Sequence, residues 1–177
     1  MLTNIELILL NFIKIKSSYA YEIERMIEEK GIRKWLKIGG PTVYQVLDRL
    51  SKKGILQVSL EKEGNMPQRK RYTLTSEGEE LCQKSARDLL ANIEPYYFDL
   101  TVGLACRFFL SEEEFRLVIQ ERLKKLNRFI SDFNDEFNKV RELYPDKRLL
   151  VRRYLLSHYK LEQKFLRDLL NDTLINP

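Results

Sequence analysis

The segment from Pro41 to Gly78, PTVYQVLDRLSKKGILQVSLEKEGNMPQRKRYTLTSEG, decides how the first half of this chain folds. Its opening part has apolar side chains at the i, i+3, i+4 and i+7 spacing of a helix with one buried face, and Gly54 is placed to end that helix. Alternating residues 56–60 then predict a half-buried strand, residues 64–67 a turn, and residues 71–75 a returning strand. The segment therefore predicts an amphipathic helix followed by a β-hairpin.

The returning side of this hairpin is basic. Arg69, Lys70 and Arg71 stand in a row directly after the turn. Residues 30–72 contain eleven Lys and Arg against three Asp and Glu, whereas residues 91–177 contain fifteen against fourteen. A solvated turn is the simple explanation of such a run, but the local excess of positive charge favours contact with a polyanion.

Two further helices are predicted before this segment. Residues 3–16 are apolar nearly all round, and Thr3 or Asn4 can cap their start. Residues 18–31 have apolar side chains at helical spacing between Ser18 and Gly31, which suit a helix start and a helix stop. Three helices followed by a basic hairpin are the order of a winged helix-turn-helix, in which the third helix enters the major groove of DNA and the hairpin contacts the backbone.

The third helix carries hydrogen-bonding groups away from its apolar stripe of Val43, Val46, Leu47 and Leu50. Thr42, Tyr44 and Gln45 can contact phosphates or base edges, although core packing is the alternative for Tyr44. Trp35 is expected in the core. The expected DNA-binding residues are Tyr19, Tyr21, Lys37, Thr42, Val43, Tyr44, Gln45, Arg49, Arg69, Lys70 and Arg71.

The second half is predicted to be entirely helical. A helix starting near Thr75 has Leu89, Leu90 and Ile93 on its apolar face and ends or kinks at Pro95. Ser111 caps a second long helix, and a last helix covers about residues 147–170. In the second helix apolar residues recur at spacings of four and three over about three and a half heptads, which predicts helix-on-helix packing, within one chain or between two. These apolar residues are Ile119, Leu123, Leu126, Ile130, Phe133, Phe137, Val140 and Tyr144.

The first half resembles the winged-helix domain of PadR-type transcriptional regulators. The matching positions are Tyr21-Glu22-Ile23, Tyr44, Leu47, Leu50, Gly54, Tyr72, Leu74, Thr75 and Gly78, whereas Ala20 and Gln45 replace the glycine and the proline of the family pattern. The resemblance covers about residues 5–90, and the helical tail is similar to the longer branch of the family. It implies a mainly α fold with a small β-hairpin, made of a winged helix-turn-helix DNA-binding domain (residues 1–92) and a C-terminal α-helical dimerisation domain (residues 93–177).

The function implied by this resemblance is a sequence-specific transcriptional regulator, a repressor that binds a short inverted repeat in double-stranded DNA as a homodimer. The expected dimerisation residues are Ile119, Leu123, Leu126, Ile130, Phe133, Phe137, Val140, Tyr144, Leu155, Tyr159 and Leu166. The alternative is a protein-interaction module whose basic face binds an acidic partner. A small aromatic effector could bind where Tyr96, Tyr97, Phe98, Phe108 and Phe109 gather, although core packing also explains these rings.

Enzymatic function is not expected. With His158 as the only histidine, the chain has no nucleophile–base pair, metal-binding spacing or glycine-rich phosphate loop, so no cofactor or metal is expected either. Cys82 and Cys106 lie in apolar helical patterns and are expected to be reduced thiols, as in a cytoplasmic protein. We find no signal peptide, and the apolar run near the N-terminus is too short to cross a membrane.

Overall fold

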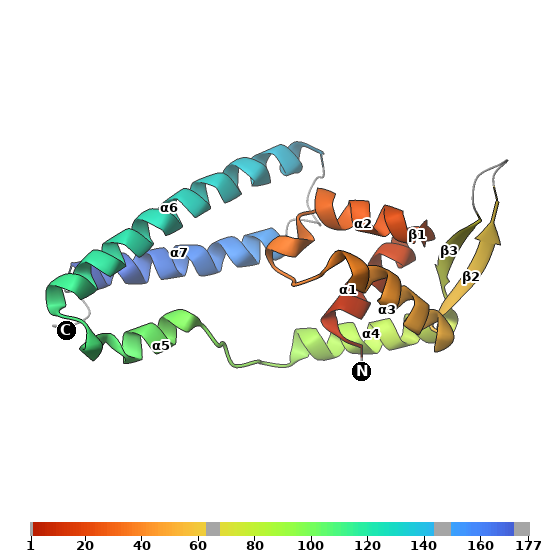
Figure 1. The fold of residues 1–177 in the computed structure, drawn as a ribbon, viewed down its shortest axis with the longest axis horizontal. Coiled ribbons are helices and arrows are strands. Elements are labelled where there is room, and N and C mark those ends of the chain that lie inside the picture. Colours follow the sequence, from red (N-terminus) through yellow and green to blue (C-terminus); the bar gives the residue numbers. More distant parts are fainter. Residues whose placement is uncertain (1, 63–67, 144–149, 172–177) are drawn as a thin grey trace. The chain divides into compact units, whose positions relative to one another are not determined.

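The computed structural model describes residues 2–62, 68–143 and 150–171, without the side chains of residues 41 and 136–143 (Figure 1). The chain divides into two compact units, residues 1–95 and 96–177, which are described separately. The first unit contains α1 (Asn4–Ile15), β1 (Ser18–Tyr19), α2 (Ala20–Glu29), the 3-10 helix η1 (Ile32–Lys34), α3 (Gly40–Lys52), β2 (Leu56–Glu61), β3 (Arg69–Leu74) and α4 (Ser76–Ala91).

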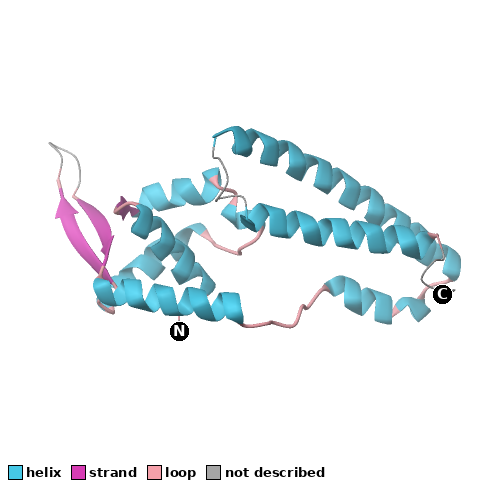
Figure 2. Cartoon of the chain, turned by 180° about the vertical axis from the view of Figure 1, so that it is seen from behind, coloured by secondary structure: helices cyan, strands magenta, loops and turns pink. Residues whose placement is uncertain are grey.

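The predicted three helices and hairpin are confirmed, and a short strand is added to them. β1 pairs antiparallel with β3, and β3 pairs antiparallel with β2, so the sheet order is β1-β3-β2 (Figure 2). The register places Tyr19 opposite Arg71 and Glu61 opposite Arg69. The β2–β3 hairpin is called the wing below. The start of α2 is hydrogen-bonded to it through β1, which fixes the wing to the helical part of the unit.

The core of the first unit lies between α1, α2, α3 and the base of the hairpin. The predicted stripe of α3 faces it, and Val43, Leu47 and Leu50 have no exposed surface. The completely buried residues facing them are Leu9, Leu10, Ile23 and Ile27. Gly54 follows α3 with a φ of 73°, a left-handed conformation that glycine adopts without strain and that lets the chain turn into β2.

The second unit is entirely helical in the part of the chain that the structure describes. It consists of α5 (Asp99–Ala105), the 3-10 helix η2 (Arg107–Phe109), α6 (Glu112–Leu143) and α7 (Leu150–Leu170). α6 and α7 lie side by side (Figures 1 and 2). Their core consists of Phe115, Ile119, Leu126, Ile130 and Leu166. None of the described helices is long and apolar enough to cross a membrane.

The heptad stripe of α6 packs inside the chain. Ile119, Leu126, Ile130 and Phe133 are buried, and Leu166 of α7 has no exposed surface. Leu123 and Tyr159 pack at the edge of this core, and Leu155 is half-buried. These buried members pack against α7 of the same chain, and the expectation that the stripe also forms the dimer seam stays a prediction. The side chains of Phe137 and Val140, and all of Tyr144, lie outside the described residues.

Several apolar side chains expected in the core are exposed instead. Leu90 and Ile93 are 88% and 97% exposed, and Leu89 is 39% exposed. α4 ends at Ala91, and residues 92–98 continue without helix or strand, all with exposed side chains. The apolar face predicted for the end of α4 is thus uncovered within the single chain.

Candidate nucleic-acid interface

Helix α3 presents a polar face opposite its buried stripe. Tyr44 is 53% exposed, Gln45 is exposed, and Thr42 is half-buried. Tyr44 therefore points outward, and its core-packing alternative is wrong. Val43 is fully buried, which leaves it no surface for a DNA contact, so we remove it from the expected contacts. Lys37 is exposed in the segment before α3.

Arg49 of α3 binds a buried carboxylate. Its Nη2 lies 3.0 Å from Oε1 of Glu6, a residue of α1 that is 4% exposed. The other oxygen of Glu6 accepts a hydrogen bond from the backbone N–H of Thr3, and the Thr3 hydroxyl accepts one from the backbone N–H of Glu6. Burial raises the pKa of Glu6, but the hydrogen bonds with Thr3 and Arg49 outweigh it and hold this pKa below its ordinary value. Arg49 thus anchors α3 to α1.

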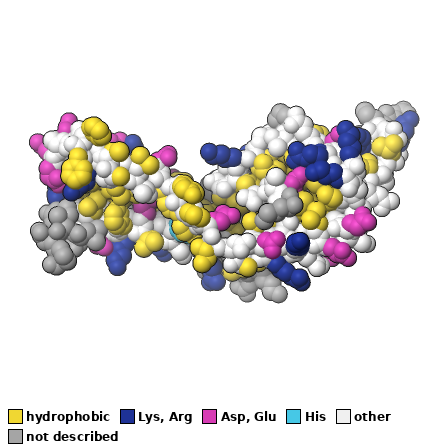
Figure 3. All heavy atoms as spheres, turned by 90° about the horizontal axis from the view of Figure 1, so that it is seen from below, with side chains coloured by type: hydrophobic (Ala, Val, Ile, Leu, Met, Phe, Trp, Pro, Cys, Tyr) yellow, Lys and Arg dark blue, Asp and Glu magenta, His cyan; other side chains and the backbone are white. Residues whose placement is uncertain are grey.

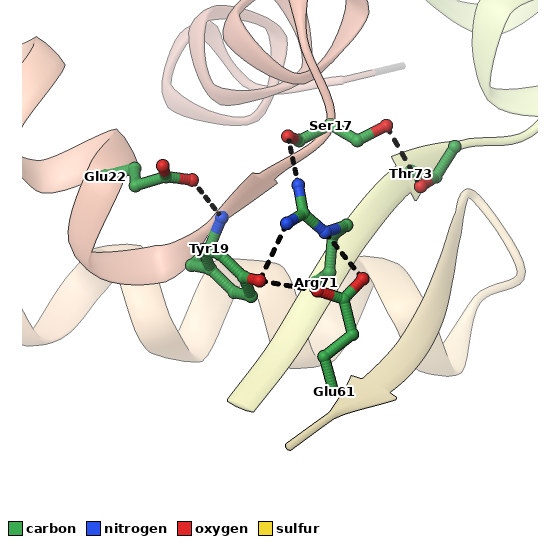
Figure 4. A network of polar contacts seen from close by, with 6 residues as sticks. All are labelled: Ser17, Tyr19, Glu22, Glu61, Arg71 and Thr73. Atoms are coloured by element: carbon green, nitrogen blue, oxygen red, sulfur yellow. Dashed lines mark hydrogen bonds and ion pairs between the residues drawn. The ribbon is translucent and has the colours of Figure 1, made fainter. Parts of the chain in front are cut away.

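A second carboxylate holds Arg71 on β3, the middle strand of the sheet (Figure 4). Arg71 donates from Nε to Oε1 of Glu61 at 2.7 Å and from Nη2 to the Tyr19 hydroxyl at 2.7 Å. The Tyr19 hydroxyl donates in turn to Oε2 of Glu61 at 2.5 Å. Arg71 also donates from Nη1 to the Ser17 carbonyl at 3.2 Å. We call Tyr19, Glu61 and Arg71 the wing triad, because they tie β1, β2 and β3 together.

The wing triad also changes the charges at this position. The hydrogen bond from Arg71, followed by that from Tyr19, lowers the pKa of Glu61. The hydrogen bond to Glu61 raises the pKa of both Tyr19 and Arg71. Glu61 is therefore ionised and Arg71 protonated at neutral pH, so the pair has no net charge. One of the three cations of the row is thus neutralised by a carboxylate of the neighbouring strand, and phosphate contact by the row stays a prediction.

The other two cations of the row have different surroundings. The Lys70 side chain is 56% exposed, with its ammonium 3.9 Å from the Asp48 carboxylate. The Arg69 guanidinium lies 5.8 Å from the centre of the Tyr21 ring, and that ring stacks on Tyr19 at 5.5 Å. Four of the expected DNA-binding residues, Tyr19, Tyr21, Arg69 and Arg71, therefore lie together. They lie beside a surface hollow lined by Tyr19, Glu61, Lys62, Arg69 and Arg71, and their contact with DNA stays a prediction.

Sequence reasoning missed both carboxylates that hold these arginines. Glu6 follows Thr3 at the spacing of a capping box, a local signal that could have located its backbone partner. Its contact with Arg49 spans 43 residues, and no local pattern encodes that distance. Glu61 is the last residue of β2, so its cross-strand neighbours follow only once the hairpin register is known.

The aromatic residues expected at an effector site do not form one cluster. Tyr97, Phe108 and Phe109 are largely exposed. Tyr96 stacks on Phe98 at 5.6 Å, and its hydroxyl lies 2.6 Å from that of Tyr154 on α7. His158 packs against the Tyr96 and Tyr154 rings. Among the described residues there is no group of three His, Cys, Asp or Glu side chains that could hold a metal ion.

Comparison with known proteins identifies the first unit. Residues 9–84 match the transcriptional regulator PadR-like family, a family of regulators and not of enzymes. A search of curated proteins found no match.

Solved structures extend the likeness over most of the chain. PadR of Bacillus subtilis in complex with operator DNA is 18% identical, with a TM-score of 0.78 over 96% of this chain and 98% of that one. The same protein in complex with p-coumaric acid gives a TM-score of 0.75 at 18% identity, over 94% and 96% of the two chains. A PadR-like transcriptional regulator of Bacillus cereus gives 0.68 at 15% identity, over 97% and 99%. The chain thus carries a PadR-family domain at residues 9–84 and has the fold of PadR-like transcriptional regulators.

Proposed function

We propose that this chain is a sequence-specific DNA-binding transcriptional regulator of the cytoplasm. The observation that carries the proposal is the outward polar face of α3, with Tyr44 and Gln45, in the same unit as a hairpin that presents Arg69 and Lys70. In this assignment α3 reads base edges in the major groove, and the wing contacts phosphates. Support comes from the PadR-family domain and from the shared fold of a PadR solved with operator DNA.

The test is fluorescence anisotropy with labelled duplexes from the region upstream of the chain's own gene and with a random-sequence duplex. We expect tighter binding to one upstream fragment, with an affinity that falls steeply as salt increases. No binding to any duplex at about 50 mM salt, where phosphate contacts are strong, would refute this function. It would favour the alternative of a module that binds an acidic protein.

Two sets of variants separate backbone contact from sequence reading. Replacing Arg69 and Lys70 by alanine should weaken binding to all duplexes by a similar factor and make the salt dependence less steep, because phosphate contacts are independent of sequence. Replacing Lys84 and Arg87 by alanine is the matched control, since both are exposed on α4. Gln45→Ala should instead change which sequence is preferred, since an amide can pair with a base edge.

We further propose that the regulator is a homodimer that represses transcription from a short inverted repeat. One winged helix contacts few bases, so two copies at fixed spacing are needed for specificity. The second unit supplies apolar surface for association, since Val102 of α5 and Leu117 and Val118 of α6 are all more than half exposed. Figure 3 shows hydrophobic side chains gathered on the face of the second unit that carries α5.

Analytical ultracentrifugation tests this part of the proposal. We expect a dimer of the full chain and a shift towards monomer when Leu117 and Val118 are both replaced by serine. The matched control replaces the exposed Lys124 and Arg128 of the same helix by serine, which should leave the dimer intact. A monomer at micromolar concentration would refute the proposed dimer. Repression is tested separately with a reporter gene under the control of the bound fragment: expression that falls when the chain is removed would refute it.

An aromatic effector is the last part of the proposal. It is supported by the packed rings of Tyr96, Phe98, Tyr154 and His158 and by the p-coumaric acid complex of a PadR with this fold. The expected result is a rise in melting temperature with p-coumaric acid but not with cyclohexanecarboxylic acid, which has no aromatic ring. Equal effects of the two acids would refute recognition of the ring.

A further inference from the structure

The wing triad contains a carboxylate where a DNA-binding surface would be expected to carry positive charge. Glu61 lines the surface hollow with Lys62, Arg69 and Arg71, on the half of the hairpin towards its turn. Its side chain is 43% exposed and that of Arg71 is 29% exposed, so the pair lies at the surface and not in the core. A phosphate that approaches this surface therefore meets a guanidinium that already donates to a carboxylate.

We propose that Glu61 competes with DNA phosphate for Arg71 and thereby limits the affinity of the wing for any duplex. This inference rests on the proposed function. Carboxylate and phosphate oxygens both accept charge-assisted hydrogen bonds from a guanidinium, so a phosphate oxygen can take the place of the Glu61 oxygen at Nε of Arg71. Glu61 now accepts from Nε at 2.7 Å. It also accepts from the Tyr19 hydroxyl at 2.5 Å, which holds the carboxylate in place.

The rest of the triad keeps Arg71 oriented while Glu61 neutralises it. The Ser17 carbonyl and the Tyr19 hydroxyl accept from its two terminal nitrogens. The Arg71 guanidinium also lies 4.4 Å from the centre of the Tyr19 ring. These contacts do not involve the carboxylate, so they remain when Glu61 loses its charge. Arg71 is then a positioned cation that has no competing anion.

The Glu61→Gln variant isolates this competition. Glutamine has nearly the same shape: its single oxygen can still accept from Arg71 and its NH2 group can donate to the Tyr19 hydroxyl, but it has no charge. We expect tighter binding to operator and random duplexes by a similar factor, because phosphate contacts do not depend on sequence. The slope of log K against log salt should become steeper by about 0.9, the change for one additional neutralised phosphate.

Two comparisons show whether the effect belongs to this pair. Glu94→Gln makes the same change in net charge at an exposed residue beyond the far end of α4, a helix of 16 residues that spans about 24 Å. It should alter affinity and salt slope much less. In an Arg71→Met background, Glu61→Gln should give no gain, because the competition acts through Arg71.

The outcomes separate this inference from the proposed function. If the unmodified protein binds no duplex, the function itself is wrong. If it binds, and Glu61→Gln matches Glu94→Gln in affinity and salt slope, the competition is refuted while the function stands. A gain that persists in the Arg71→Met background also refutes it, because the charge of Glu61 would then act on DNA directly. Circular dichroism on every variant confirms that the fold is retained.

Discussion

Arg49→Met tests the anchoring of α3 to α1. The substitution keeps most of the aliphatic stem but leaves the Glu6 carboxylate, which is 4% exposed, without its charged partner. Hydrogen bonds to charged groups contribute about 1.5–3 kcal/mol, and the lower end applies because Arg49 is half exposed and screened by water. Glu6 also keeps its hydrogen bond from Thr3. We therefore expect a loss of about 1–2 kcal/mol in the free energy of unfolding at neutral pH.

The pH dependence of this loss provides the sharper test. The pKa of Glu6 is lowered in the folded protein, so the ionised carboxylate stabilises the fold above its unfolded pKa. That contribution disappears as the pH falls through the folded pKa. Urea denaturation at a series of pH values should show the difference between the unmodified protein and Arg49→Met narrowing below about pH 4. The matched control is Arg25→Met, which breaks only an exposed pair with Glu29 on α2.

Two results would refute this reasoning. One is a neutral-pH difference as small as that of Arg25→Met, which would mean that Arg49 does not stabilise the buried carboxylate. The other is a difference that stays constant into the acid range, which would assign the loss to packing of the side chain and not to its charge.

Two other predictions concern packing, and both are checked by urea denaturation. Gly78→Ala should destabilise the first unit by about 1–3 kcal/mol, because the new Cβ would lie 2.4 Å from the carbonyl oxygen of Ile55. The control is Gly103→Ala, which should not destabilise the protein because the new Cβ would lie in open space. Leu166→Ala should cost about 2–5 kcal/mol, because this side chain is completely buried between α6 and α7, whereas alanine at the largely exposed Leu161 should have little effect.

The sequence predicted the elements of the first unit well because each has a local signal. The apolar stripe of α3 and the turn residues of the hairpin specify their elements without reference to distant parts of the chain. β1 was missed because two residues are too few to show alternation. Leu60, expected on the buried side with Leu56 and Val58, is 59% exposed. It lies towards the tip of the hairpin, where no helix covers it.

The site was less predictable than the fold because its contacts are non-local. The run of cations suggested three equivalent phosphate contacts. In the structure Arg71 instead donates to Glu61 of the neighbouring strand, and the Lys70 ammonium lies near the Asp48 carboxylate. Periodicity has a related limit in the second unit. The heptad spacing of α6 correctly predicts a packed face, but the same pattern results whether the partner helix belongs to the same chain or to another.

The uncovered segment at residues 92–98 has a practical consequence for proteolysis. It follows α4 without helix or strand, and Tyr96, Tyr97 and Phe98 are all exposed in the single chain. Exposed, irregular backbone with aromatic side chains is a preferred substrate of chymotrypsin. Brief digestion should therefore cut the chain between its two units and release the PadR-family domain as a fragment. If a second copy covers this segment, cleavage will slow as protein concentration rises, so the digestion rate also reports on self-association.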